Sequence, residues 1–200
     1  MSSVTAAPVG GVVPMSRRVM NLAHIVTQNA RRLPAHPAFI QGDLRHDWKG
    51  FDAQVSALAA GLKARGIGKG DRLLVHSKNC DAMFVSMFAT FRLGAVWVPT
   101  NFRLLPDEVA YLATASGAKG FLCHGDFPEH AAAVAATSPA PEFTWRIGEG
   151  AFGEDEVGAV IARHRGERIE NAAVEHADPC WFFFTSGPTG RPKAAVLTPG

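Results

Sequence analysis

Residues 72–123 decide the fold, and they spell RLLVHSKNCDAMFVSMFATFRLGAVWVPTNFRLLPDEVAYLATASGAKGFLC. Short apolar runs of strand length alternate in this stretch with longer segments whose apolar residues recur at helical spacing. In chain order, the pattern predicts strand 72–76, helix 81–93, strand 95–98, helix 105–116 and strand 119–123. Strands that alternate with helices at this spacing are typical of a parallel sheet joined by helical crossovers. The stretch therefore indicates an α/β protein with a parallel sheet flanked by helices.

The flanking sequence extends this pattern on both sides. Upstream, apolar spacing predicts a helix from residue 20 or 21 to 33, a small hairpin at 38–48 and a helix at 49–65. Downstream, the weaker signals predict a helix at 127–136, a strand at 143–147 and a helix at 155–165. We divide the chain into a flexible tail (1–18), an α/β subdomain (19–176) and the opening of a next subdomain (177–200).

Composition and charge exclude several classes of protein. The chain has 200 residues, with 20 Lys and Arg against 18 Asp and Glu, for a formal net charge of +2. This balance gives no basic stripe for nucleic acid and no polybasic cluster for anionic lipid. The longest uncharged apolar stretch, 82–91, is far shorter than the roughly 20 residues of a membrane span. The start of the chain lacks the apolar block of a signal peptide, so we expect a cytoplasmic protein.

The three cysteines and eight histidines give no support for a metal site or a disulfide framework. Cys80, Cys123 and Cys180 are far apart in sequence, and no histidine pair has the spacing of metal ligands. An odd number of scattered cysteines suits a reducing compartment. We expect small, buried, apolar cysteines and no metal ligands.

The loop after residue 185 carries the chemistry. The apolar run 180–185 has the length of a buried strand, and a second apolar run follows at 194–198. Glycines in the loop between them would let backbone N–H groups approach a phosphate, with nearby hydroxyls and a lysine as further donors. It is not a Walker A motif, because residue 192 is proline and a strand follows. An ordinary turn has a similar composition. Composition alone therefore does not distinguish a phosphate-binding loop from a turn.

The family signature favours the phosphate loop. Residues 183–196, FFTSGPTGRPKAAV, resemble the AMP-binding signature of the adenylate-forming superfamily, which includes acyl-CoA synthetases. Upstream, 65–72 (RGIGKGDR) and 93–104 (LGAVWVPTNFRL) resemble family segments of the acyl-CoA synthetase type, and the resemblance covers residues 20–200. It implies these cofactor-binding residues: Thr185, Ser186, Gly187, Thr189, Gly190 and Lys193.

The resemblance implies a ligase that uses ATP, Mg²⁺ and CoA. A carboxylic acid, expected to be a fatty acid, would attack the α-phosphate of ATP to give an acyl-adenylate, which CoA would convert to acyl-CoA. The loop would hold the β- and γ-phosphates and stabilise charge as pyrophosphate leaves. The expected partner is a small carboxylic acid, without nucleic acid or a membrane span, and a homo-oligomer is left open.

The sequence departs from the family at two positions of the signature. Pro188 replaces the usual Ser or Thr, which removes a backbone N–H and a hydroxyl, and Ala194 replaces Gly. Family members also continue beyond this loop, into segments that carry the adenine, ribose and metal contacts and a late catalytic lysine. We therefore expect an N-terminal fragment that contains no catalytic residue and is inactive alone. The alternative is a non-catalytic α/β module that binds a protein partner through an uncovered sheet edge.

Overall fold

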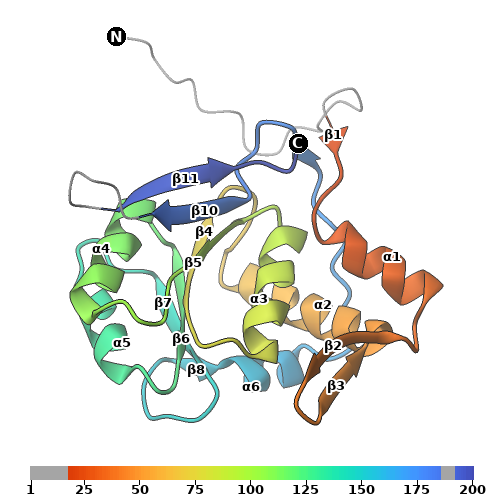
Figure 1. The fold of residues 1–200 in the computed structure, drawn as a ribbon, viewed down its shortest axis with the longest axis horizontal. Helices are drawn as coiled ribbons and strands as arrows, with labels where there is room; N and C mark the ends of the chain where they lie inside the picture. The colour runs from red at the N-terminus through yellow and green to blue at the C-terminus, as the bar shows by residue number, and fades with distance from the viewer. Residues whose placement is uncertain (1–17, 186–191) are drawn as a thin grey trace.

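The computed structural model describes residues 18–185 and 192–200, and its main sheet has seven strands. Their spatial order is β11-β10-β5-β4-β6-β7-β8. The strands are β4 (Arg72–His76), β5 (Val96–Pro99), β6 (Gly120–His124), β7 (Phe143–Ile147), β8 (Asp155–Glu156), β10 (Trp181–Thr185) and β11 (Lys193–Leu197). Every neighbouring pair is parallel except β10–β11. The predicted parallel α/β class is thereby confirmed (Figure 1).

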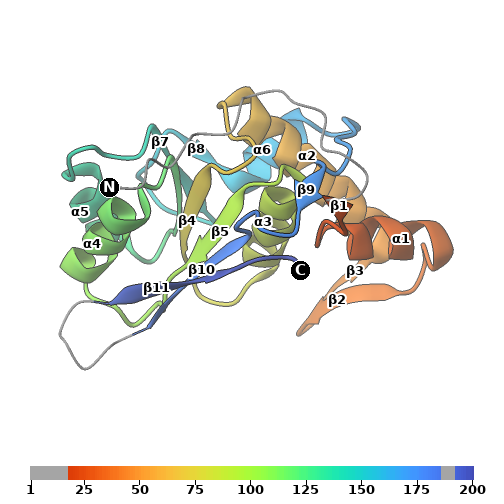
Figure 2. The ribbon, with the colours of Figure 1, turned by 90° about the horizontal axis from the view of Figure 1, so that it is seen from above.

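Helices cover both faces of the sheet. One face carries α2 (Trp48–Ala64), α3 (Asp81–Arg92) and α6 (Val157–Arg163), and the other carries α4 (Pro106–Ser116) and α5 (Pro128–Ala135). Figure 2 shows α4 and α5 on one side of the central strands, with α2 and α3 on the other. The result is a three-layer arrangement with a hydrophobic core on each side of the sheet.

Strand periodicity explains why two cores form. On β4, Leu73 and Val75 face the core under α2 and α3, whereas Leu74 faces the core under α4 and α5. On β6, Leu122 faces the core under α2 and α3, and Phe121 faces the core under α4 and α5. Successive side chains of a strand point to opposite faces, so a strand covered on both sides is apolar almost throughout.

The order of the strands places the loops that follow them. The chain passes from β4 to its neighbour β5, and then returns across β4 to β6 on the other side. This is a doubly wound order, in which loops after the carboxyl ends of parallel strands meet at one edge of the sheet. The loops after β4, β5 and β6 belong to that edge, toward which β10 also runs.

The N-terminal part packs on the outside of α2. It consists of α1 (His24–Arg32) and a hairpin of β2 (Pro37–Gln41) and β3 (Leu44–Asp47). Outside the main sheet, β1 (Arg18–Val19) pairs with β9 (Val174–Glu175). Residues 1–17 of the predicted tail lie outside the described residues.

The first helix begins later than the predicted residue 20 or 21, and Asn21 explains the difference. Its side-chain amide is buried and donates to the carbonyls of Phe91 at 2.7 Å and Ala172 at 3.1 Å. Its side-chain oxygen accepts from the N–H of Ala23 at 2.8 Å. Asn21 therefore ties the chain to α3 and to the segment before β9, and the helix starts only after it.

The strand predicted at 180–185 is present as β10 (Trp181–Thr185), but the prediction that it is buried is wrong. In the register of β10, only Trp181 has a partner on β5, and the rest of the strand pairs with β11 alone. Phe182 and Phe184 pack on the core under α4, but Phe183 on the other face is 50% exposed, and all of β11 is exposed. An apolar run is buried only where both faces are covered, and here the face that carries Phe183 is covered only at Trp181, which packs against Phe91.

The cysteines follow the prediction only in part. Cys123 is fully buried, and this burial raises the pKa of its thiol to about 12. Cys80 and Cys180 are half-buried, and all three thiols are free. No helix in the described ranges 18–185 and 192–200 is long and apolar enough to cross a membrane.

Candidate phosphate-binding site

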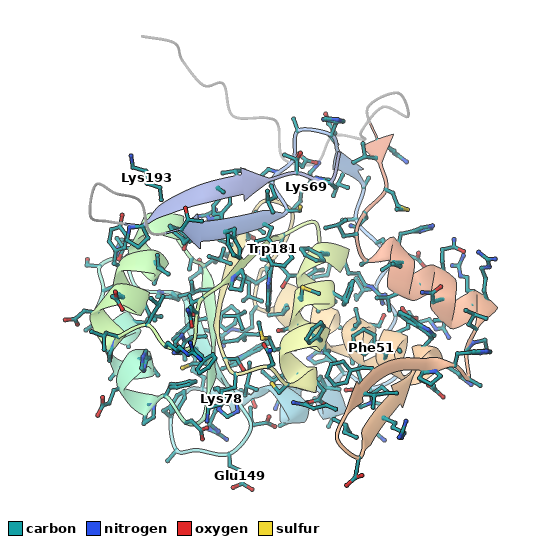
Figure 3. All side chains as sticks on the ribbon, in the orientation of Figure 1. Phe51, Lys69, Lys78, Glu149, Trp181 and Lys193 are labelled. Carbon is teal, nitrogen blue, oxygen red and sulfur yellow. The ribbon has the colours of Figure 1, made fainter. Side chains whose placement is uncertain are left out.

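The hairpin of β10 and β11 carries two of the predicted site residues. Thr185 and Lys193 are directly opposite each other and form the pair closest to the connecting loop, and both are exposed. Figure 3 shows Lys193 at the end of β11 that lies beside α4. The other predicted site residues, Ser186, Gly187, Thr189 and Gly190, lie outside the described residues.

The hairpin is attached to the main sheet where β10 begins. Trp181 is in register with Trp97 of β5, and the N–H of Trp97 donates to the carbonyl of Cys180 at 2.9 Å. Because β10 runs parallel to β5, Thr185 lies toward the same edge as the carboxyl ends of β4 and β5. The candidate site is therefore at the edge of the sheet where α/β proteins bind ligands.

A hydrogen bond between side chains joins the ends of β4 and β5 at this edge. His76 Nδ1 lies 2.6 Å from Thr100 Oγ1, and that hydroxyl donates to the Val75 carbonyl at 3.2 Å. The Thr100 oxygen therefore accepts the proton of His76 Nδ1, which assigns the neutral tautomer with its lone pair on Nε2. Nε2 is buried and has no hydrogen-bond partner among the described residues.

A second histidine ties α5 to the loop after β5. The His130 ring stacks on His76 with the ring centroids 4.4 Å apart, and His130 Nε2 donates to the Leu104 carbonyl at 2.8 Å. Burial, and then the neighbouring His130 and His124, lower the pKa of His76 from 6.5 to about 4. His76 is therefore uncharged at neutral pH, and the bond from His130 holds the loop 101–105 in place.

The site offers chemistry suited to an anion. Lys193 supplies a mobile positive charge, and Thr185, which is paired with it across the two strands, supplies a hydroxyl. A protonated amine donates strong, charge-assisted hydrogen bonds to phosphate oxygens. In residues 18–185 and 192–200, no three His, Cys, Asp or Glu side chains lie close enough together to hold a metal ion. The described donors therefore suit a phosphate-containing anion.

A separate hollow lies on the opposite face of the sheet. Its volume is about 610 Å³, and its walls come from α2, α3, α6 and the ends of β6 and β7. Its lining includes Cys80, His124 and Arg165, but no residue of β10 or β11. It is not part of the candidate site.

Two features near the site had no signal in the sequence. His76 and His130 are far apart in the chain and lack any ligand spacing, so nothing predicts their stacking. Tyr111, the single tyrosine of the chain, reaches Pro192 next to Lys193 although 81 positions separate them. Both contacts arise from the topology, which brings α4 and α5 beside the ends of the strands.

Comparison with known proteins identifies the class to which this fold and hairpin belong. Residues 26–200 match the model of a family described as AMP-binding enzyme, and the chain belongs to this family. A feruloyl-CoA synthase from Amycolatopsis sp is 35% identical over 173 residues, and a long-chain-fatty-acid–CoA ligase, FadD13, from Mycobacterium tuberculosis is 30% identical over 183. These matches cover 86% and 89% of this chain but only 32% and 35% of the relatives. The chain thus spans about a third of the length of these relatives.

Solved structures agree on the fold. A protein from Rhodopseudomonas palustris described as a long-chain-fatty-acid CoA ligase superposes with a TM-score of 0.79 at 25% identity. That match covers 90% of this chain and 45% of the other. The anthranilate CoA ligase AuaEII superposes with a TM-score of 0.84 at 23% identity, over 90% of this chain and 35% of the other. These superpositions show the shared fold, and membership of the AMP-binding enzyme family rests on the match over residues 26–200.

Proposed function

We propose that the chain is the phosphate-binding part of an ATP-dependent ligase that converts a carboxylic acid to an acyl-adenylate and then to a CoA thioester. The observation that carries this proposal is the pairing of Thr185 and Lys193 on either side of the signature loop. Family membership over residues 26–200 supports it. The alternative of a partner-binding module has no specific observation in its favour.

The relatives differ most in the carboxylic acid for which they are named. The relative at 35% identity is named for an aromatic acid, and the relative at 30% identity is named for long-chain fatty acids. We propose a hydrophobic carboxylic acid as the substrate class, and a fatty acid within it as our sequence-based hypothesis. Mg²⁺ would enter with ATP, and CoA would be the acceptor of the acyl group.

The chain itself would contribute binding and charge stabilisation. Lys193 would donate to the β- and γ-phosphates, and Thr185, Ser186 and Thr189 would add hydroxyl donors, with Gly187 and Gly190 allowing close backbone approach. These contacts would stabilise the charge that develops as pyrophosphate departs. No group in the chain is proposed to act as acid, base or nucleophile, and the chain alone is proposed to be inactive.

We also propose that residues 177–200 open a following subdomain. The exposed apolar side chains of the hairpin support this division, since Phe183 and Leu197, which share one face of the ladder, are each about half exposed. Apolar side chains gathered on one face are a common feature of surfaces that pack against further structure.

Equilibrium binding of Mg–ATP tests the proposal. Lys193→Ala should weaken binding about 10-fold or more, because a charge-assisted hydrogen bond contributes about 1.5–3 kcal/mol. Lys63→Ala is the matched control, since Lys63 is also an exposed lysine but lies on the last turn of α2. Equal affinity of the two variants for Mg–ATP would reject the assignment of Lys193, and a wild-type chain that binds no Mg–ATP would reject the proposed function.

A further inference from the structure

One hydrogen bond connects α4 to the residue that precedes Lys193. The hydroxyl of Tyr111 donates to the carbonyl oxygen of Pro192 at 3.3 Å. Tyr111 is half-buried, and its ring packs on the same core cluster as Phe182 and Phe184 of β10. The ring is therefore held by packing on the side of the hairpin that faces the protein, and its hydroxyl reaches across to the neighbouring strand.

The position of this bond matters because a peptide unit is planar. The carbonyl of Pro192 and the N–H and Cα of Lys193 belong to one rigid unit. A hydrogen bond that fixes the carbonyl oxygen therefore also restricts the Cα from which the Lys193 side chain projects. On the other side, Lys193 is held by its ladder pairing with Thr185. The two contacts together orient the start of an otherwise exposed, flexible side chain.

We propose that Tyr111 is a positioning residue for Lys193: its hydroxyl fixes the Pro192–Lys193 peptide so that the lysine ammonium is directed toward bound polyphosphate. This inference rests on the proposed function, because it assigns Tyr111 to the same phosphate site. Phosphate affinity would then depend also on Tyr111 of α4, a residue outside the signature.

A double-mutant cycle tests whether Tyr111 acts through Lys193. The affinity for Mg–tripolyphosphate is measured by calorimetry for the wild type, Tyr111→Phe, Lys193→Ala and the double variant. Removing one hydroxyl should weaken binding about fivefold in the wild-type background, as expected for loss of a neutral hydrogen bond. In the Lys193→Ala background the same change should have no effect, because coupled residues are not additive.

A control and a spectroscopic signature separate positioning from general destabilisation. Thr114→Val removes a hydroxyl from the same helix that, among the described residues, donates to the Ala110 carbonyl of that helix, so its affinity should equal that of the wild type. Selective ¹⁵N-lysine labelling gives six backbone amides, one of which is Lys193. The Lys193 amide resonance should shift in Tyr111→Phe and stay in place in Thr114→Val.

These measurements distinguish failure of the positioning role from failure of the proposed function. A fivefold loss that disappears without Lys193, together with the amide shift, supports the proposal. If Lys193→Ala weakens binding but Tyr111→Phe does not, the positioning role is wrong and the proposed function stands. An equal loss in both backgrounds would mean a structural effect independent of Lys193 and would also overturn it. If the wild type binds no tripolyphosphate, the proposed function fails, and this inference fails with it.

Discussion

His76 and Thr100 are joined by a 2.6 Å hydrogen bond that links the ends of β4 and β5 inside the protein. Because Nδ1 donates to the Thr100 oxygen, protonation would occur at Nε2, which is buried without a hydrogen-bond partner among the described residues, and would place a charge beside His130. Burial lowers the pKa of His76 to about 4 from 6.5. Burial of this ring therefore makes the stability of this edge sensitive to acid.

The pH dependence follows from the sign of the shift. Between pH 6.5 and pH 4 the unfolded chain binds a proton at residue 76 that the folded chain does not, so stability decreases as pH falls through this window. We expect a loss of about 2–3 kcal/mol from this group between pH 7 and pH 4. His76→Asn should make the free energy of unfolding less dependent on pH over this range, as measured by urea denaturation.

The matched control for this prediction is His36→Asn, because His36 is exposed and the substitution is the same. Its pH dependence should follow that of the wild type. If His76→Asn retains the full slope between pH 6.5 and pH 4, the buried neutral histidine is not its source.

A second prediction concerns the turn that leaves β6 toward α5. A Cβ added at Gly125 would lie 1.5 Å from the carbonyl oxygen of Glu149, which is main chain and cannot rotate away. Gly125→Ala should therefore lower stability by about 2 kcal/mol or more, within the range expected for overpacking. Gly68→Ala should be close to neutral, because its Cβ would meet nothing closer than 4.0 Å. Thermal unfolding of the two variants measures the difference, and equal melting temperatures would contradict the placement of this turn.

A third prediction tests which face of β10 is covered. Phe184 packs on the core under α4, whereas Phe183 is 50% exposed. Phe184→Ala should cost about 2 kcal/mol more than Phe183→Ala, because burial of an aromatic ring contributes about 1.5–3 kcal/mol. Chemical denaturation of both variants checks this order. If the Phe183 variant were the less stable one, the faces of the strand would be assigned the wrong way round.

A fourth prediction concerns the departure from the family signature at Pro188. Pro188→Thr restores a backbone N–H and a hydroxyl at a position where the family usually has both donors. Each new hydrogen bond to a charged phosphate contributes about 1.5–3 kcal/mol, so Mg–ATP should bind at least about 10-fold more tightly. Calorimetry of the variant measures this change, and unchanged or weaker affinity would show that position 188 donates nothing to the ligand.

Much of the fold follows from local pattern. Strands 72–76 and 143–147 have the predicted bounds, and the helices around them lie within a few residues of expectation, because buried strands and amphipathic helices depend on local periodicity. The start of α1 was displaced by the long-range bonds of Asn21, which no local pattern encodes. The burial of β10 was mispredicted for a similar reason: apolarity shows that a strand can be covered, not that its neighbour is present.

The residues of the candidate site likewise include some that local sequence predicts and some that only the fold brings together. The signature located Thr185 and Lys193, and the ladder places them opposite each other. Sequence reasoning could not find Tyr111 or the His76–His130 stack, because their relevance depends on contacts across the fold. The roles of Ser186, Gly187, Thr189 and Gly190 remain predictions from the signature.

If the proposed function holds, Lys193 lies beside the phosphates of bound ATP. An ATP acyl-phosphate probe tests it directly, because a lysine amine near the phosphates attacks the acyl carbonyl, forms an amide and releases ATP. Tandem mass spectrometry then identifies which of the six lysines carries the label. Labelling should be concentrated at Lys193 and suppressed by excess Mg–ATP. Labelling spread over the other lysines, or insensitive to Mg–ATP, would contradict this placement of Lys193.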